Sequence, residues 1–313
     1  MLHDWAIMHE SLFAKSGLSL DRLRSFSEVV QAGGITAAAK GDPNRQSQFS
    51  RQLKELEEFF GAELFIHGRR RFALTSAGKA LHGIVQMQFA ALDELRRTCA
   101  ETPVELRVGA GESLLQWFLL PRLPELRQSL SSTSFVLQNL QTEEILARLM
   151  DGRTDFGLIR HNAVGKSLKS ARLFTLEYGL FVPRKALPAS RALISERILG
   201  RLSLATLEGN GRLVRCLKEQ AQILGIRLNV ELACSSYTQA AEAVRRLGLA
   251  AVLPVIAASA FDPDEVEHVK LPFLRELACP MALAWNGRVA AIRPAVGSAS
   301  RMLAEILGSA PRA

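Results

Sequence analysis

Cysteine is scarce in this sequence, and long apolar runs are missing. The four cysteines (Cys99, Cys216, Cys234 and Cys279) lie far apart, and none forms a Cys-x-x-Cys pair or stands with histidines at metal-ligand spacing. We therefore expect reduced, mostly buried thiols in the cytoplasm, with no metal and no cofactor. The chain is 48% apolar, yet no run approaches the roughly 18 apolar residues of a membrane-spanning helix. A membrane partner is therefore excluded.

Recognisable catalytic motifs are also missing. The sequence has no Gly-x-x-x-x-Gly-Lys phosphate loop, no Gly-x-Ser-x-Gly nucleophile elbow and no His-Glu-x-x-His metal helix, and its six histidines are scattered. We expect no enzymatic activity. The alternative is an α/β enzyme or small-molecule-binding protein whose N-terminal helices only mediate assembly.

Length and net charge limit the number of domains and the class of partner, but they do not locate a binding site. With 313 residues the chain can form two or three domains, and its net charge of +8 favours a polyanionic partner. Residues 18–79 hold ten Lys and Arg against seven Asp and Glu, whereas residues 180–230 hold nine against three. Charge alone therefore does not identify a nucleic-acid-binding end. Residues 1–17 are expected to be a disordered or extra segment.

Three helices are predicted near the N-terminus. Apolar residues recur at helical spacing from Leu20 to Val30, and Gly33-Gly34 ends that pattern. A short helix of small residues follows at 36–40. Asp42 then caps a third helix, with Pro43 in its first position, that runs to about Phe60. This order predicts a helix-turn-helix domain over residues 18–79.

The third helix has two chemically different faces. One is an apolar stripe of Phe49, Leu53, Leu56 and Phe60, which must pack on the first two helices. The other is polar and suited to contacts with base edges and phosphates in a major groove. The predicted DNA-contacting residues on it are Arg45, Gln46, Ser47, Ser50, Arg51 and Lys54. The alternative interpretation is a solvated helix face.

A basic hairpin is predicted after Gly61. Residues 62–66 and 72–74 read as two short strands around a tip that carries Arg69, Arg70 and Arg71. Beside a recognition helix, three arginines are suited to neutralise phosphates or enter a narrow minor groove. This predicts a DNA-binding wing, and the alternative is a solvated loop tip.

These residues carry a family resemblance. The run Gly33-Gly34-Ile35-Thr36-Ala37-Ala38-Ala39, followed by Gln46, Ser50-Arg51-Gln52-Leu53, Leu56-Glu57, Gly61, Leu64-Phe65 and Leu74-Thr75-x-Ala77-Gly78, resembles the N-terminal domain of LysR-type transcriptional regulators. The resemblance implies a winged helix-turn-helix, a dimer or tetramer that binds double-stranded DNA, and RNA polymerase as a partner. The sequence departs from the family at Arg45 and Gln48, so base preference is not carried over.

A long connecting helix is predicted over residues 75–102. Leu81, Val85, Gln88, Leu92, Leu95 and Cys99 form a nearly apolar seam in steps of four and three. A single helix cannot bury such a seam on itself, so it packs on a second chain or on its own chain. The resemblance favours the second chain, and the predicted dimerisation residues are Leu81, Val85, Leu92 and Leu95.

Strands and helices alternate after Pro103, which predicts a two-lobed α/β domain over residues 103–313. The first lobe is expected to comprise 103–180 and 266–313, and the second 181–265. The resemblance implies a fold like that of periplasmic binding proteins. The fold class is therefore a helical winged helix-turn-helix, a linker helix and a two-lobed α/β effector domain.

Ligands of open α/β sheets bind beyond the carboxyl ends of the strands. The residues there, which are the predicted effector-binding residues, are Glu112, Ser113, Arg160, His161, Glu208, Ser235 and Ser236. Arg160 and His161 suit an anionic effector, whereas Glu112 argues against a simple carboxylate. The sequence alone does not decide which class of effector binds. Each residue is alternatively an ordinary helix cap or surface residue.

These observations predict a sequence-specific DNA-binding transcriptional regulator that is controlled by a small-molecule effector. A nonspecific architectural DNA binder is a further alternative. It would lose DNA binding with added salt and would show no preferred site.

Overall fold

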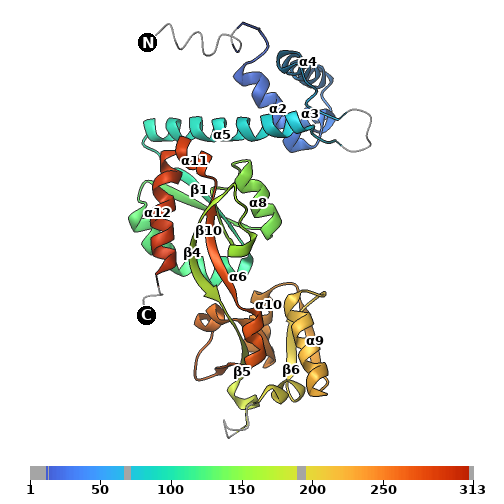
Figure 1. The fold of residues 1–313 in the computed structure, drawn as a ribbon, viewed down its shortest axis with the longest axis vertical. Helices are drawn as coiled ribbons and strands as arrows, with labels where there is room; N and C mark the ends of the chain where they lie inside the picture. Colours follow the sequence, from blue (N-terminus) through green and yellow to red (C-terminus); the bar gives the residue numbers. More distant parts are fainter. Residues whose placement is uncertain (1–11, 13, 67–71, 189–194, 310–313) are drawn as a thin grey trace. The chain divides into compact units, whose positions relative to one another are not determined.

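The structure is a computed structural model that describes residues 12, 14–66, 72–188 and 195–309 (Figure 1). It comprises a helical unit, formed mainly by residues up to Leu95, and an α/β unit that begins at Arg96. Each unit has its own hydrophobic core and is described separately. Within the described ranges, no helix has both the length and the apolar character needed to cross a membrane.

The helical unit follows the predicted order. Its helices are α2 (Leu20–Ala32), α3 (Ile35–Ala39), α4 (Pro43–Phe60) and most of α5 (Ser76–Cys99). The Asp42 side chain accepts hydrogen bonds from the backbone N–H groups of Asn44 and Arg45, so it caps α4 as predicted. Gly33 and Gly61 end α2 and α4 at positive φ angles of 77° and 64°, which glycine adopts without strain.

The core of the helical unit lies between α2, α4 and the first half of α5. It contains Phe26, Val29, Phe49, Leu53, Leu56, Leu64, Leu81 and Val85. Leu81 and Val85 are 7% and 1% exposed. The prediction that these two residues contact a second chain is therefore wrong, because their side chains already pack inside their own unit. Leu92 and Leu95 lie further along α5 and are exposed.

The hairpin after α4 is less regular than predicted. Residues 62–66 and 72–74 form no continuous ladder; a single antiparallel bridge joins Phe65 and Leu74. Two hydrogen bonds form this bridge, from the N–H of Ile66 to the carbonyl of Ala73 at 2.9 Å and from the N–H of Thr75 to the carbonyl of Leu64 at 3.1 Å. The rings of Phe26 and Phe65 lie 5.6 Å apart, so the hairpin stem packs on the helical core. The two ends of the hairpin therefore meet, but the strand prediction overstated their pairing.

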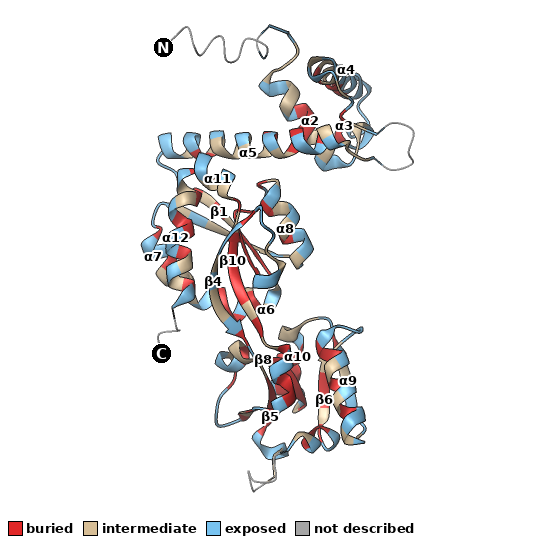
Figure 2. Cartoon of the chain, viewed as in Figure 1, coloured by how far each residue is buried: buried red, intermediate tan, exposed pale blue. Residues whose placement is uncertain are grey.

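The α/β unit contains two five-stranded sheets, one in each lobe. The first sheet has the order β2-β1-β3-β10-β4, with β1 (Val104–Ala110), β2 (Thr133–Asn139), β3 (Phe156–Arg160), β4 (Lys169–Leu176) and β10 (Cys279–Trp285). The second has the order β7-β6-β8-β5-β9, with β5 (Tyr178–Pro183), β6 (Ser203–Leu207), β7 (Asn229–Cys234), β8 (Ala250–Pro254) and β9 (Val266–Val269). Figure 2 shows that the central strands are buried while the outer helix faces are exposed.

Helices cover the first sheet on both sides. Figure 1 shows α12 (Pro294–Gly308) on one side of the sheet and α8 (Thr142–Met150) on the other. Between β1 and β2 the chain forms a succession of α6 (Glu112–Leu114), a π-helical turn η1 (Leu115–Leu119), a 3-10 turn η2 (Leu120–Arg122) and α7 (Leu123–Ser129). Arg293, which precedes α12, is buried and hydrogen-bonded to the buried carboxylate of Asp155. This ion pair fixes the end of the chain to the sheet.

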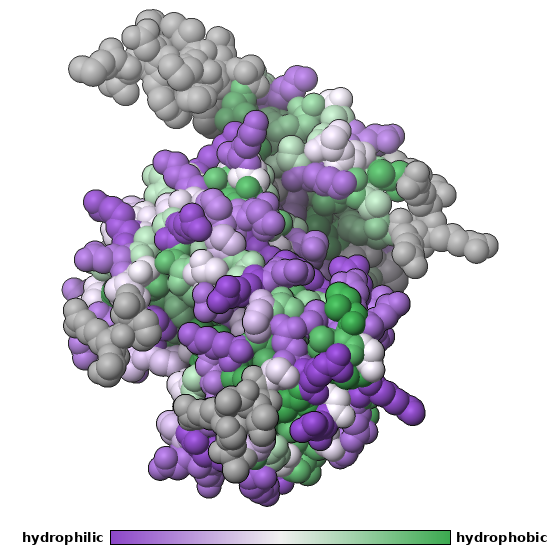
Figure 3. All heavy atoms as spheres, turned by 60° about the horizontal axis from the view of Figure 1, so that its bottom comes forward, coloured by the Kyte–Doolittle hydropathy of each residue, from purple (hydrophilic) through white to green (hydrophobic). Residues whose placement is uncertain are grey.

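The second sheet also has two covered faces. The helix α9 (Arg212–Leu224) contributes Leu213 and Leu217 to one apolar cluster, and α10 (Tyr237–Leu247) contributes Ala240 and Val244 to another. Further short 3-10 turns are η3 (His161–Ala163), η4 (Arg184–Ala186), η6 (Glu196–Gly200), η7 (Val255–Ala260) and η8 (Pro272–Leu277), and a short helix α11 (Gly287–Ile292) precedes α12. Figure 3 turns this end of the molecule forward and shows apolar areas between polar ones.

The chain crosses between the lobes twice, but not at the predicted residues. Strand β9 pairs with β5 in the second sheet, Leu180 lying opposite Val269. The prediction that the first lobe ends at 180 and resumes at 266 is therefore wrong. The first crossing lies at Glu177, between β4 and β5, and the second spans residues 270–278, between β9 and β10. The prediction failed because β5, which follows the first crossing, pairs with β9, which precedes the second. Both strands therefore belong to the second lobe.

Candidate nucleic-acid interface and ligand cleft

The polar face of α4 is open to solvent. Arg45, Gln46, Ser47, Ser50, Arg51 and Lys54 are all exposed. On the opposite face Phe49, Leu53 and Leu56 are 5%, 3% and 0% exposed. The predicted division of the helix into an apolar and a polar face is confirmed, except that Phe60 is 42% exposed and stacks edge-on against Phe59 instead of joining the core.

The three basic side chains on this face, those of Arg45, Arg51 and Lys54, each lie near an acidic side chain without being buried. The Nε of Arg51 lies 3.0 Å from a carboxylate oxygen of Glu55, and the Arg51 side chain is 82% exposed. Glu55 also accepts a hydrogen bond from Arg22 of α2, and the two arginines lower the pKa of this carboxyl group. Arg45 lies 3.7 Å from Glu28 and over the ring of Phe49. Exposed ion pairs contribute little to stability, so these arginines can exchange partners for DNA at small cost.

Ser47, Ser50 and Gln46 are the other predicted base-reading residues on α4. None of the three side chains hydrogen-bonds to another described residue. Their donors and acceptors are therefore available to an incoming duplex. The three predicted wing arginines, Arg69, Arg70 and Arg71, lie outside the described residues.

The two lobes of the α/β unit meet through a short chain of hydroxyl and carboxylate groups. Glu112, the first residue of α6, accepts a hydrogen bond from the hydroxyl of Thr238 in α10. The Thr238 hydroxyl lies 2.8 Å from that of Ser236, which caps α10. The structure thus brings together Glu112 of the first lobe and Ser236 of the second, as the carboxyl-end rule predicted.

A pair of tyrosines lies beside this contact. The rings of Tyr178, at the start of β5, and Tyr237, at the start of α10, are in contact, with their centroids 5.9 Å apart. Burial raises the pKa of both hydroxyls, and Arg160 of the first lobe and the thiol of Cys279 are close enough to influence both pKa values. Both tyrosines are therefore neutral at pH 7. Together with Arg160 they provide neutral donors and acceptors next to one cation.

The remaining predicted effector residues are dispersed. Glu208 lines a separate pocket of about 350 Å³ between β6, β7 and α9. Ser235 hydrogen-bonds to Gln239 one turn along α10 at 3.0 Å. His161 is exposed in η3, and Ser113 is half-buried next to Glu112. None of these four is hydrogen-bonded into the Glu112–Thr238 contact.

Sequence reasoning missed Thr238, Tyr178 and Tyr237. Tyr237 and Thr238 directly follow Ser236 at the start of α10, so the rule that selected Ser235 and Ser236 would have found them had it been extended by two residues. Tyr178 had no such signal, because its position depends on where the chain crosses between the lobes.

Models of known protein families match both units of the chain. The model of the LysR substrate binding domain matches residues 101–304, and the model of bacterial regulatory helix-turn-helix proteins of the lysR family matches residues 20–79. The Hca operon transcriptional activator HcaR of Escherichia coli K12 is 30% identical over 161 residues, which are 50% of this chain and 54% of HcaR. The regulator PtxR of Pseudomonas aeruginosa is 30% identical over 116 residues, 36% of this chain and 37% of PtxR. This chain thus matches about half or less of these relatives' length.

Solved structures share the fold over nearly the whole chain. A full-length OxyR variant from Pseudomonas aeruginosa has a TM-score of 0.64 at 19% identity, covering 94% of this chain and 95% of that one. Full-length CbnR, solved in complex with its target DNA, has a TM-score of 0.56 at 20% identity, covering 91% and 99%. Because the substrate-binding-domain model spans well over half of the sequence and the helix-turn-helix model covers the other unit, the chain belongs to the LysR family of bacterial transcriptional regulators.

Proposed function

We propose that this protein is a cytoplasmic, sequence-specific DNA-binding regulator that reads DNA through α4. The observation that carries the proposal is the two-sidedness of this helix. Leu53 and Leu56 anchor one face in the core, while Gln46, Ser50 and Arg51 stand exposed on the other. Arg and Gln side chains match the paired acceptor and donor groups of guanine and adenine in a major groove.

The proposed active form is a symmetric homodimer or homotetramer. Two recognition helices would then enter successive major grooves of an inverted repeat, with the wing arginines on the backbone. Leu92 and Leu95 support this assembly, because both are large apolar residues exposed on one stretch of α5, at 47% and 60%. RNA polymerase is the proposed partner through which bound protein changes transcription.

Control by a small-molecule effector is the second part of the proposal. The effector would bind between the lobes, near Arg160, Tyr178, Tyr237 and the Glu112–Thr238 hydrogen bond. A ligand that competes for Thr238 or Glu112 changes the free energy of the lobe arrangement seen here, and a shift between arrangements alters the oligomer and its spacing on DNA.

We propose binding without catalysis as the role of the α/β unit. The groups gathered between the lobes are a cation, two neutral tyrosine hydroxyls and a carboxylate already engaged by Thr238. These groups are suited to recognise a polar molecule. The alternative of an enzyme whose N-terminal helices only mediate assembly leaves the exposed polar face of α4 without a role.

A DNase footprint of the purified protein on its own upstream region tests the proposal. We expect a protected inverted repeat that persists at moderate salt, since specific binding exceeds nonspecific binding by about 10³–10⁷-fold. Protection that spreads evenly over the fragment and vanishes with added salt would instead show a nonspecific architectural binder, and no protection at all would reject the proposal.

A further inference from the structure

A small pocket lies where the chain crosses between the two lobes. It is lined by Glu177 of the first crossing, by Tyr178 at the start of β5, and by Lys270, Leu271, Pro272, Leu274, Arg275 and Ala278 of the second crossing. Its volume is about 240 Å³. We call it the crossover pocket. Ligand pockets for drug-sized molecules occupy about 300–1,000 Å³, so this one is suited to a smaller molecule.

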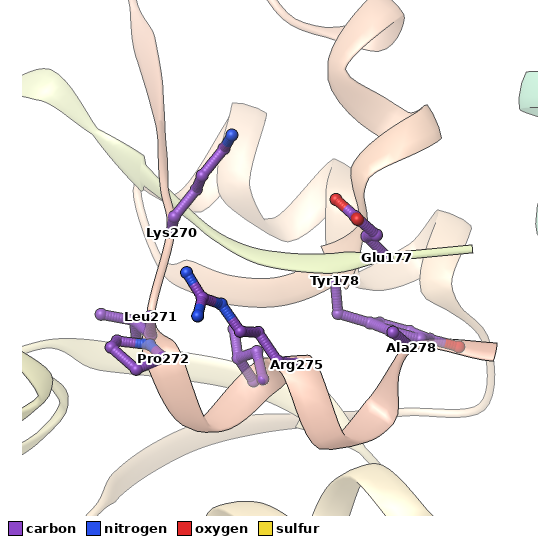
Figure 4. A pocket seen from close by; sticks show the side chains of 8 residues that line it. Glu177, Tyr178, Lys270, Leu271, Pro272, Arg275 and Ala278 are labelled. Carbon is purple, nitrogen blue, oxygen red and sulfur yellow. The ribbon is translucent and has the colours of Figure 1, made fainter. Parts of the chain in front are cut away.

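The crossover pocket contains charges of both signs. Lys270 and Arg275 are positive and Glu177 is negative, and Figure 4 shows the two basic side chains on one side of the view and Glu177 on the other. Lys270 lowers and Glu177 raises the pKa of the same neighbour, His268, so both charges lie close to it. None of the three charged side chains forms an ion pair with another described residue. The pocket thus presents two cations and one anion that are unpaired within the described protein.

The rest of the pocket wall is apolar. Leu274 is 1% exposed and Ala278 is half-buried, while the ring of Tyr178 reaches the same cavity. A ligand that fills the pocket therefore needs a small apolar part in addition to its charges. Burying that part contributes roughly 25 cal/mol per Å² of apolar surface.

We propose that the crossover pocket binds a small zwitterion, namely an α-amino acid with an apolar side chain. The carboxylate pairs with Arg275 and Lys270, and a guanidinium can donate two parallel hydrogen bonds to it. The ammonium group pairs with Glu177. The apolar side chain packs against Tyr178, Leu274 and Ala278. A simple carboxylate would leave Glu177 unpaired, and a simple amine would leave both cations unpaired.

Binding at this place connects the two crossings. Glu177 and Lys270 belong to the two segments whose backbone must rotate when one lobe turns against the other. A ligand that holds both segments together therefore favours one lobe arrangement. The ligand-binding step itself is independent of the proposed DNA-binding function, and its test requires no DNA.

Isothermal titration of the full-length protein with three matched compounds tests the proposal. L-leucine carries both charges, isocaproate lacks the ammonium group, and isoamylamine lacks the carboxylate. We expect saturable binding of L-leucine with a Kd of about 1 mM or tighter. Each single-charge compound should bind about tenfold more weakly or worse. Equal binding of L-leucine and isocaproate, or no saturable binding of L-leucine, would overturn the proposal.

Variants locate the site. Glu177→Gln should weaken L-leucine binding while leaving isocaproate binding unchanged, and Arg275→Gln should weaken both. Arg160→Gln tests the effector position proposed above, and Lys166→Gln, which alters an exposed cation outside both places, is the matched charge control and should leave L-leucine binding unchanged. Loss of L-leucine binding in Arg160→Gln but not in Arg275→Gln would place the ligand near Arg160 and reject the crossover site. A thermal melt of each variant confirms that it is folded.

Discussion

The carboxylate of Glu112 in the first lobe accepts a hydrogen bond from the hydroxyl of Thr238 in the second lobe. Thr238→Val removes the hydroxyl and keeps the shape of the side chain. A net hydrogen bond contributes about 0.5–1.5 kcal/mol, so the variant should populate a more open lobe arrangement. Small-angle X-ray scattering of the full-length protein should show a larger radius of gyration.

Ser235→Ala is the control for this experiment. Ser235 is a neighbouring serine whose hydroxyl bonds only within its own segment, to Gln239. The Ser235→Ala variant should leave the scattering curve unchanged. An unchanged curve for Thr238→Val would mean that the Glu112–Thr238 bond does not hold the lobes together.

A second prediction concerns Gly179 in β5 and His268 in the neighbouring strand β9. A Cβ atom at residue 179 would lie 1.9 Å from Nε2 of His268. Gly179→Ala should therefore destabilise the protein by about 1–3 kcal/mol or more, the cost of overpacking. Urea denaturation should show a smaller effect of the same substitution in a His268→Ala background, because the colliding ring is gone. Equal losses in both backgrounds would contradict the proposed contact.

A third prediction concerns pH. Burial lowers the pKa of His268 from its ordinary value of 6.5, Lys270 lowers it further, and Nε2 of His268 is buried without a hydrogen-bond partner. The folded state therefore disfavours the protonated ring, while the unfolded chain binds the proton below about pH 6.5. The contribution that the neutral His268 ring makes to folding stability is therefore complete above about pH 6.5 and is lost as the pH falls.

The melting temperatures of wild type and His268→Gln should be measured between about pH 7.5 and about pH 5.5, which are one unit either side of the ordinary histidine pKa. The variant should lose less stability on acidification than wild type. Burial also lowers the pKa of His82, so some acid sensitivity should remain. His161→Gln alters an exposed histidine and should follow the wild-type curve. Parallel curves for wild type and His268→Gln would reject a role for His268.

Local signals predicted most of the fold. Asp42 and Pro43 fixed the start of α4 and Gly61 its end, because capping and a positive φ are properties of single residues. Features that depend on distant partners were harder to predict. The strands Tyr178–Pro183 and Val266–Val269 pair with each other across more than eighty intervening residues, and no short pattern reveals that.

The candidate sites also divide into features that local spacing predicts and features that depend on distant parts of the chain. The polar face of α4 follows from helical spacing alone, so its residues were found from sequence. Leu81 and Val85 belong to the same apolar seam as Leu92 and Leu95, yet the first pair is buried in its own unit and the second is exposed. Spacing identifies a seam but not what covers each part of it. Tyr178 could not be found from spacing, because its position depends on where the chain first crosses between the lobes.

The exposed end of the seam gives a fourth prediction. Burying a leucine side chain contributes about 1.5–3 kcal/mol, so Leu92→Glu or Leu95→Glu should raise the dimer dissociation constant at least tenfold. Analytical ultracentrifugation of the full-length variants measures this. Leu20→Glu replaces a leucine of α2 that is 61% exposed and should leave the dimer intact. If the Leu92 and Leu95 variants sediment like wild type, the dimer interface lies elsewhere.

The last prediction separates base reading from backbone binding. Arg51 shares Glu55 with Arg22, so Arg51→Ala leaves this carboxylate paired and the helix packing intact. Removing the Arg51 side chain should therefore affect DNA recognition and not folding. The free-energy difference between binding to the operator and binding to random DNA should fall by about 1–3 kcal/mol. Arg70→Ala in the predicted wing should weaken binding to both DNAs alike and reduce the slope of log affinity against log salt by about 0.9. Competition gel-shift assays at several salt concentrations measure both effects, with Arg24→Ala on α2 as the control for a change in net charge. Equal losses of Arg51→Ala on operator and random DNA would show that Arg51 contacts phosphates and that another residue of α4 reads the bases.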